Sequence, residues 1–241
     1  TNGGSAISKV SKTSGTTVDL TGYTPTRDGY TFDGWYSNSA LTIKVTSIKL
    51  TSNTTIYAKW TTKSDMSFTD VADKAYYRDA VEWAVENGIT KGTTATTFSP
   101  NATCTRAQAV TFLWRAAGSP EPETRAMPFT DIPVGSYYYD AVLWAVENGI
   151  TKGTSETMFS PDATCTRAQI VAFLWRSEKS PAAGTANPFA DVKSTVYYAD
   201  AVLWAVKEDI TKGTTSTTFS PNAGCTRAQI VTFLYRAYQG K

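Results

Sequence analysis

Three copies of a five-residue motif carry the side chains best suited to specific chemistry. The motif Cys-Thr-Arg-Ala-Gln begins at Cys104, Cys165 and Cys225. This spacing indicates a module of about sixty residues that occurs three times. Each copy holds a guanidinium, whose planar fork can bind a carboxylate through two hydrogen bonds. We therefore expect each Arg to meet either an acid elsewhere in the fold or an anionic ligand.

The same motif predicts where a helix begins. Thr105 and Gln108 stand three positions apart just before an apolar run, as in a capping box. In such a box the Thr hydroxyl accepts from the backbone N–H of Gln, and the Gln side chain accepts from the backbone N–H of Thr. Arg106 then takes the first helical position, where an exposed cation costs about 0.3–1 kcal/mol. A locally unfavourable residue that occurs three times suggests that the Arg serves a partner, either an acid elsewhere in the fold or an anionic ligand.

The three Cys residues occupy one equivalent position per repeat, so they cannot all pair with one another. Their place directly before a helix cap favours small buried hydrophobic side chains with free thiols. A site of three thiolates around a pseudo-threefold axis is the metal-binding alternative. We expect no metal and no cofactor.

Histidine is absent from the sequence. This excludes Ser-His and Cys-His nucleophile activation and removes the commonest zinc ligand. Carboxylates are numerous, but none has a spacing that singles out a pair for hydrolysis. We therefore predict no catalytic residues and a protein that is not an enzyme.

Charge and hydropathy narrow the partners further. The 241 residues carry a formal charge of +2, and residues 1–61 hold six basic and three acidic residues, so neither nucleic acid nor a membrane surface is favoured. No apolar run approaches the roughly 18 residues that span a bilayer. The chain begins at Thr1 without a charged start and an apolar segment, as expected for a mature fragment of a longer protein.

Each repeat contains two different apolar segments. In the first, Tyr77, Ala80, Val81, Ala84 and Val85 form one stripe of a helix of about three turns. Asn-Gly closes this helix in the first two repeats, and Glu-Asp takes its place in the third. A Thr-rich loop follows, whose backbone amides and hydroxyls would suit a polyhydroxylated ligand.

The second segment is apolar around almost its whole circumference, as in residues 170–175, which indicates a helix buried on most sides. Three such helices bury one another most simply as a central three-helix bundle. Pro-containing links at 119–122 and 180–184 then return the chain to the next Phe-x-Asp.

Residues 1–60 instead alternate in the manner of short strands at 16–20, 30–32 and 54–60, separated by Gly-containing turns. The run from Pro25 to Tyr36 and the closing run from Thr55 to Trp60 resemble the internalin-type B repeat, or Listeria–Bacteroides repeat. The resemblance implies a β-grasp-like module of a bacterial surface protein. We expect Trp35 and Trp60 in its core rather than on a binding surface.

The repeats resemble a tandem of S-layer homology domains. The motifs that carry the likeness are Phe-x-Asp-Val, a first helix with Tyr and Trp, Gly-Ile-x-x-Gly, Phe-x-Pro and Thr-Arg-Ala, each in register three times. The likeness implies an all-α pseudo-threefold bundle with a central three-helix core. The expected α+β multi-domain chain divides into a β module at 1–60, a linker at 61–67, and repeats at 68–119, 129–180 and 189–241.

The likeness also implies that grooves between repeats bind secondary cell wall polysaccharide, commonly pyruvylated, at the extracellular wall or S-layer of a Gram-positive-type bacterium. The predicted glycan-binding set comprises the motif arginines, the Phe-x-Asp acids, the loop glycines and lysines, and the first-helix tryptophans: Arg106, Arg167, Arg227, Asp70, Asp131, Asp191, Gly92, Gly153, Gly213, Lys91, Lys152, Lys212, Trp83, Trp144 and Trp204. The family Glu of the motif is Gln in all three copies, which should make each groove more positive.

Several alternatives remain open at this point. Each motif Arg could instead pair with a Phe-x-Asp acid and lock one repeat to the next, and each Trp could belong to the core rather than stack on sugar. The predicted function is non-catalytic anchoring to wall polysaccharide or a peptidoglycan-linked glycan. The alternatives are a module that binds other surface proteins, with mainly structural repeats, and the anchoring fragment of a larger surface enzyme.

Overall fold

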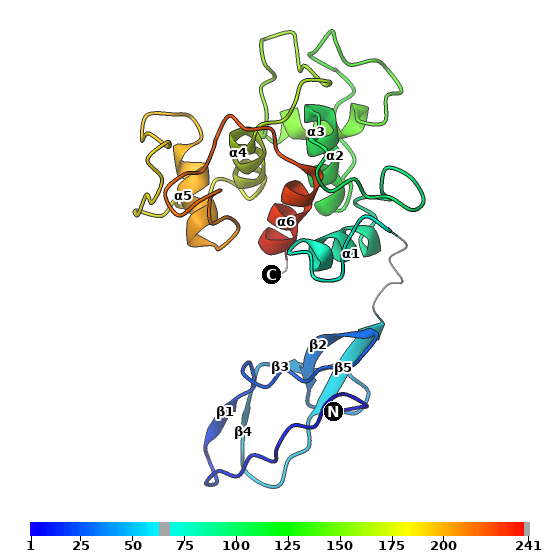
Figure 1. Cartoon of the computed structure of the whole chain (residues 1–241), viewed down its shortest axis with the longest axis vertical. Helices are drawn as coiled ribbons and strands as arrows, with labels where there is room; N and C mark the ends of the chain where they lie inside the picture. Colours follow the sequence, from blue (N-terminus) through cyan, green and yellow to red (C-terminus); the bar gives the residue numbers. More distant parts are fainter. Residues whose placement is uncertain (63–67, 239–241) are drawn as a thin grey trace. The chain divides into compact units, whose positions relative to one another are not determined.

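The computed structural model describes residues 1–62 and 68–238. The chain separates into two compact units, Thr1–Met66 and Ser67–Lys241 (Figure 1). Residues 61 and 62 belong to the last strand of the first unit. The rest of the predicted linker, residues 63–67, and the last three residues of the third repeat lie outside the described residues.

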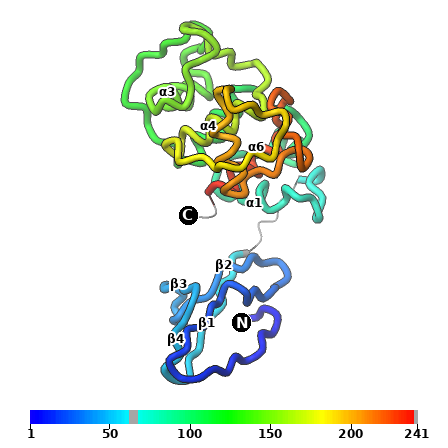
Figure 2. The backbone as a smooth tube through the Cα atoms, turned by 90° about the vertical axis from the view of Figure 1, so that its left-hand side faces the viewer, coloured from blue at the N-terminus to red at the C-terminus, as the bar shows by residue number. Residues whose placement is uncertain are grey.

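The first unit is built from short antiparallel strands, as the alternating sequence predicts. β1 and β4 form one sheet (Figure 2), and β3, β2 and β5 form another in that order (Figure 1). Among residues 1–62 the structure contains no helix. The strands are β1 (Thr17–Asp19), β2 (Tyr30–Tyr36), β3 (Lys44–Val45), β4 (Ser47–Lys49) and β5 (Tyr57–Thr62).

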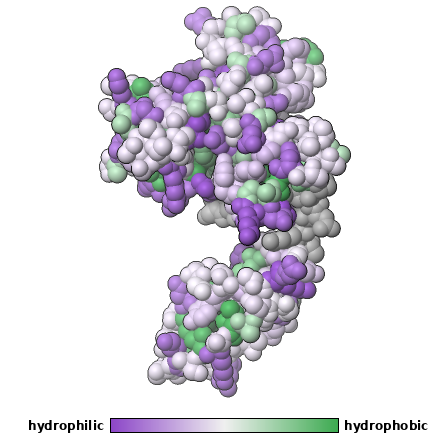
Figure 3. All heavy atoms as spheres, in the orientation of Figure 1, coloured by the Kyte–Doolittle hydropathy of each residue, from purple (hydrophilic) through white to green (hydrophobic). Residues whose placement is uncertain are grey.

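The core of this unit gathers around Trp35, which is 6% exposed and whose indole donates to the Tyr23 carbonyl. Trp60 packs against the same cluster and makes a tilted ring contact with Phe32. Both tryptophans therefore serve the core, as predicted. Beside Trp35 a cavity of about 710 Å³ opens, lined by both apolar and polar side chains, with Lys9 and Lys12 among them. Figure 3 shows apolar residues gathered at the surface of this unit.

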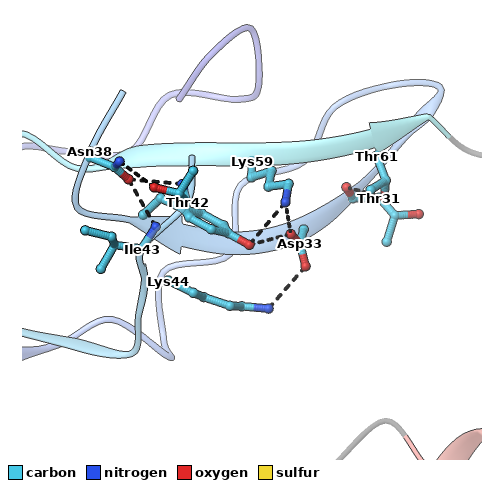
Figure 4. A network of polar contacts seen from close by, with 9 residues as sticks. Thr31, Asp33, Asn38, Thr42, Ile43, Lys44, Lys59 and Thr61 are labelled. Atoms are coloured by element: carbon cyan, nitrogen blue, oxygen red, sulfur yellow. Dashed lines mark hydrogen bonds and ion pairs between the residues drawn. The ribbon is translucent and has the colours of Figure 1, made fainter. Parts of the chain in front are cut away.

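Polar contacts fasten the three-stranded sheet on its other side. Asp33 accepts a hydrogen bond from the Tyr36 hydroxyl, and its carboxylate oxygens lie 3.1 Å from Nζ of Lys44 and 3.4 Å from Nζ of Lys59 (Figure 4). The two lysines come from the strands on either side of β2. These contacts hold the pKa of Asp33 below its usual range against the opposing effect of burial.

The second unit contains two helices per repeat, so the chain has the predicted α+β composition. The first helices are α1 (Arg78–Glu86), α3 (Tyr139–Glu147) and α5 (Ala199–Lys207). The second helices are α2 (Arg106–Ala116), α4 (Arg167–Ser177) and α6 (Arg227–Tyr238).

Each second helix begins at the motif Arg, as the capping box predicts. The backbone N–H of Gln108 donates to the Thr105 hydroxyl, and the backbone N–H of Thr105 donates to the side-chain oxygen of Gln108. Equivalent pairs of hydrogen bonds occur at Thr166 and Thr226. The predicted left-handed residues that end the first helices are present as well, since φ is +67° at Gly88 and +55° at Asp209.

The second helices contact one another, and their motifs meet in a ring of backbone hydrogen bonds. The Cys104 amide donates to the Cys225 carbonyl, Cys165 donates to Cys104, and Cys225 donates to Cys165, at 2.8–3.0 Å. Each second helix also contacts the first helix of the following repeat: α2 packs on α3, and α4 packs on α5. α6 packs on α1, so the last helix of the chain closes against the first (Figure 1).

Candidate functional site

The motif arginines are buried and reach across to a different repeat. Arg106 and Arg167 are each 3% exposed, and Arg227 is 5% exposed. Nε of Arg106 donates to the Phe159 carbonyl at 2.8 Å. Arg167 and Arg227 make the same bond to Phe219 and Phe98, at 2.8 and 2.7 Å. Each guanidinium thus joins its own repeat to the loop of another, and burial lowers its pKa from the usual value.

Nε of each guanidinium is committed to a hydrogen bond between repeats, but Nη2 is not always used. Nη2 of Arg106 and Nη2 of Arg167 are buried without a hydrogen-bond partner. Nη2 of Arg227 donates to the Thr90 hydroxyl at 3.3 Å. A buried donor without an acceptor costs about 1–3 kcal/mol. An anionic ligand would supply the missing acceptor at the first two positions.

The Phe-x-Asp acids do not pair directly with these arginines. Asp70 accepts from the Phe98 amide at 2.8 Å and from the Ser99 amide at 2.7 Å. Asp131 and Asp191 accept the equivalent pairs of amides in their own repeats. Because Arg227 binds the Phe98 carbonyl, acid and base meet through one Phe residue rather than in an ion pair. The acids therefore fix the loop to which another repeat's Arg binds.

Many polar groups of the Thr-rich loop form hydrogen bonds within the loop. The amides of Thr93 and Thr94 donate to the Thr97 carbonyl, and the Gly92 amide donates to the Thr90 hydroxyl. Gly92 has φ +85°, and a Cβ there would lie 2.5 Å from Phe68 and 2.6 Å from the Thr97 carbonyl oxygen. Gly153 and Gly213 have the same conformation and equally close neighbours. These glycines are required by loop packing.

The first-helix tryptophans lie largely inside the repeat unit. Trp144 is 8% exposed and Trp204 is 5% exposed. Trp83 is half-buried and packs edge-on against Tyr235, with ring centroids 5.8 Å apart. This geometry gives the tryptophans a clear packing role and leaves little ring surface for a sugar.

The loop lysines are exposed, and one of them borders a cavity with a motif Arg. Lys212, Gly213 and Gln229 of the third repeat line a cavity of about 200 Å³ together with Arg167 of the second repeat and Tyr76 of the first. Arg236 of α6 lines it too. One groove therefore combines side chains from all three repeats, which we call the Arg167 groove.

The tyrosine of this groove was absent from the predicted set. Tyr76 and its counterparts Tyr137 and Tyr197 are 66%, 59% and 60% exposed, unusual for so large a ring. Each lies edge-on against the next Tyr at 5.0 Å. The repeated Tyr-Tyr pair in the sequence could have identified them. Arg236 was missed as well, and its Nη1 donates to the Ile210 carbonyl at 3.0 Å.

The cysteines are free and buried, as predicted. Burial raises the pKa of Cys104 and Cys165 to about 12 and also raises that of Cys225. Within residues 1–62 and 68–238 no cluster of three or more Cys, Asp or Glu is arranged to hold a metal ion. The described helices also include none long and apolar enough to cross a membrane.

Comparison with protein families finds two matches. The Listeria-Bacteroides repeat domain matches residues 1–59. The S-layer homology domain matches residues 67–110, 128–171 and 188–231, each of which ends within a second helix. The chain belongs to the S-layer homology family. Both family resemblances predicted from the sequence are thereby confirmed.

Relatives of this S-layer homology protein include surface-layer proteins and an enzyme. The surface-layer 125 kDa protein of Lysinibacillus sphaericus is 31% identical over 169 residues, 68% of this chain and 14% of that protein. The S-layer protein sap of Bacillus anthracis is 30% identical over 112 residues, 46% of this chain and 14% of the relative. An endoglucanase of Bacillus sp. (strain KSM-635) is 32% identical over 124 residues, 52% of this chain and 13% of the enzyme.

The chain therefore spans a small share of the length of these relatives. The family and its surface-layer relatives make it a cell-surface anchoring module of a Gram-positive-type bacterium.

Proposed function

We propose that the repeats bind an anionic secondary cell wall polysaccharide, with pyruvylated glycan as the leading candidate. The observation that carries the proposal is the buried motif Arg, whose Nη2 has no acceptor in two of the three copies, together with the exposed Lys212 and Tyr76 that line the same cavity as Arg167. A carboxylate on a sugar would accept from that nitrogen, and a charge-assisted bond of this kind is about twice as strong as a neutral one. The protein then anchors without catalysis.

The same proposal includes the arrangement and bounds of the domains. Repeats at 68–119, 129–180 and 189–241 form a pseudo-threefold bundle in which each groove takes its Tyr, its Arg and its loop from three different repeats. The N-terminal module at 1–60, which we take to be β-grasp-like, acts as a spacer. The ring of Cys hydrogen bonds and the contact of α6 with α1 support this arrangement.

Changing the ligand tests the proposal without disturbing the fold. The whole chain is mixed with purified Gram-positive sacculi that are native, depyruvylated, or stripped of secondary polysaccharide, and bound protein is measured after sedimentation. We expect strong binding to native sacculi, clearly weaker binding after depyruvylation, and background levels after stripping. Equal binding to native and stripped sacculi would show that the polysaccharide is not the ligand.

A variant pair tests the grooves. Lys91, Lys152 and Lys212 are changed together to Ala, and the control changes Lys9, Lys12 and Lys49, so both variants lose three positive charges. We expect only the first to lose affinity for native sacculi, because Lys212 lines the Arg167 groove and Lys91 and Lys152 occupy the equivalent loop positions. Equal loss in both variants would indicate unspecific attraction to an acidic wall.

The enzyme among the relatives favours a second candidate, in which this chain is the anchoring part of a larger surface enzyme. Mass spectrometry of the intact cellular protein would decide, by finding or not finding a catalytic domain on the same polypeptide.

A further inference from the structure

The three motif arginines share one position in the repeat but differ in the hydrogen bonding of Nη2. Arg167 Nη2 is buried and unpartnered, and Arg167 lines a cavity of about 200 Å³. Arg227 Nη2 already donates to the Thr90 hydroxyl. A ligand carboxylate would meet a free donor in the first case and would have to replace an existing hydrogen bond in the second.

The groove of Arg106 is intermediate between these two in how ready it is to accept a ligand. Arg106 Nη2 is unpartnered, as in Arg167. The guanidinium of Arg176, however, sits 6.0 Å from the centre of the exposed Tyr197 ring. These two residues are the repeat equivalents of Arg236 and Tyr76, so two side chains of this groove already face one another. Ala172 also replaces the Thr232 that lines the Arg167 groove. An incoming glycan therefore meets a groove that is partly closed by its own side chains.

We propose that the Arg167 groove is the dominant binding groove, the groove of Arg106 the second, and the groove of Arg227 the weakest. This ranking rests on the proposed function, since it assumes that an anionic glycan enters the grooves. The expected difference in affinity arises from whether Nη2 of the buried guanidinium already has an acceptor before the ligand binds. A buried donor that gains its first acceptor contributes more than a donor that exchanges one acceptor for another.

Positive charge makes the Arg167 groove suited to an anion, but the equivalent positions of the other two grooves carry the same cations, so charge does not set the order. Lys212, Arg236 and Arg167 all line the cavity. Among the described residues none of these three side chains forms an ion pair. Three cations that form no ion pair favour an anion at this place. The aromatic ring of Tyr76 on the opposite repeat offers a surface on which a sugar can stack.

The exposed tyrosines provide a matched test, because each belongs to one groove. Tyr76 lines the Arg167 groove, and by repeat equivalence Tyr197 belongs to the groove of Arg106 and Tyr137 to the groove of Arg227. Tyr76→Ala, Tyr197→Ala and Tyr137→Ala are compared for binding to native sacculi. We expect Tyr76→Ala to weaken binding about tenfold and Tyr137→Ala less than about twofold, with Tyr197→Ala between them. Equal losses in the three variants, or the largest loss in Tyr137→Ala, would overturn the ranking.

A second pair of variants tests the cause. Thr90→Val and Thr151→Val each remove a hydroxyl that accepts from a loop glycine amide, Gly92 or Gly153. Only Thr90→Val also frees Nη2 of Arg227. We expect Thr90→Val, combined with Tyr76→Ala, to recover part of the lost affinity, whereas Thr151→Val in the same background recovers none. Identical behaviour of the two double variants would contradict the role of the Thr90 bond.

Different experimental results would contradict the ranking and the proposed function. If sacculi stripped of polysaccharide bind the unaltered chain as well as native sacculi do, the proposed function itself is wrong. If only native sacculi bind but the tyrosine variants do not follow the expected order, the function stands and the ranking is wrong.

Discussion

At the scale of single residues, the motif Arg is both a structural clamp and a candidate ligand contact. Its Nε joins two repeats through a Phe carbonyl, and in two of three copies its Nη2 has no partner. The sequence analysis left a structural and a binding role open for this residue. The geometry supports both roles, because they use different nitrogens of one side chain.

The Phe-x-Asp acids should matter for stability through the loop that they hold. Asp70→Asn replaces a carboxylate that accepts two amides, at Phe98 and Ser99, and should lower the free energy of unfolding by about 1.5–3 kcal/mol. Urea denaturation measures this. Asp73→Asn is the control, since its carboxylate is 93% exposed in an ion pair with Arg78 and should change stability by no more than about 1 kcal/mol. Equal effects would show that the loop hydrogen bonds are unimportant.

The buried thiols should make the fold sensitive to alkali. The pKa of Cys104 and Cys165 is raised to about 12 in the folded state, from the ordinary value of 9.0. Between these values the unfolded chain releases protons that the folded chain keeps, so stability is lost as pH rises from 9 towards 12. Denaturation curves across this range should fall more steeply for the native sequence than for a variant with all three Cys changed to Ala. Parallel curves would contradict the assignment.

At the scale of helices and strands, local signals in the sequence predict a good deal. The pairs Thr105 and Gln108, and their copies, predict that each second helix begins at the motif Arg, because a capping box acts within four residues. The partner of each Arg could not be predicted in this way. Arg106 binds the carbonyl of Phe159, 53 residues away, and such a contact depends on how the repeats pack.

The Gln of the capping box gives a prediction with opposite effects on stability and binding. Gln229 caps α6 and lines the cavity of the Arg167 groove. Gln229→Glu should keep the cap and gain about 0.3–1 kcal/mol from the helix dipole. The new negative charge should weaken binding to native sacculi, and less so at high salt, because salt screens charges at the surface. Thermal unfolding and sedimentation measure the two effects. A variant that binds more tightly would argue against an anionic ligand.

At the scale of the whole molecule, the two units have separate cores, and the polar groove belongs to the repeats alone. The first unit has its own buried core of Val18, Leu20, Trp35 and Ala58. The Arg167 groove is lined only by residues of the second unit. A fragment of residues 68–241 should therefore bind native sacculi with the affinity of the whole chain. A large loss of affinity would mean that the N-terminal module contributes to the site.

The repeats should unfold as one unit, because no repeat completes its own packing. α2 packs on α3, α4 on α5, and α6 on α1, so each second helix depends on a first helix from elsewhere in the ring. Helix N-termini are shared as well, since the amides of Arg106 and Arg227 donate to the carbonyls of Ala163 and Ala102 in other repeats.

Removal of one repeat should consequently damage the two that remain. A fragment of residues 129–241 lacks α1, which leaves the face of α6 around Tyr235 without the Trp83 ring that covers it. Uncovered apolar surface costs about 25 cal/mol per Å². We expect calorimetry to give one sharp transition for residues 68–241 and a broad or absent transition for 129–241. A sharp, independent transition in the shorter fragment would contradict the closed ring of helix contacts, because two repeats would then suffice to bury their second helices.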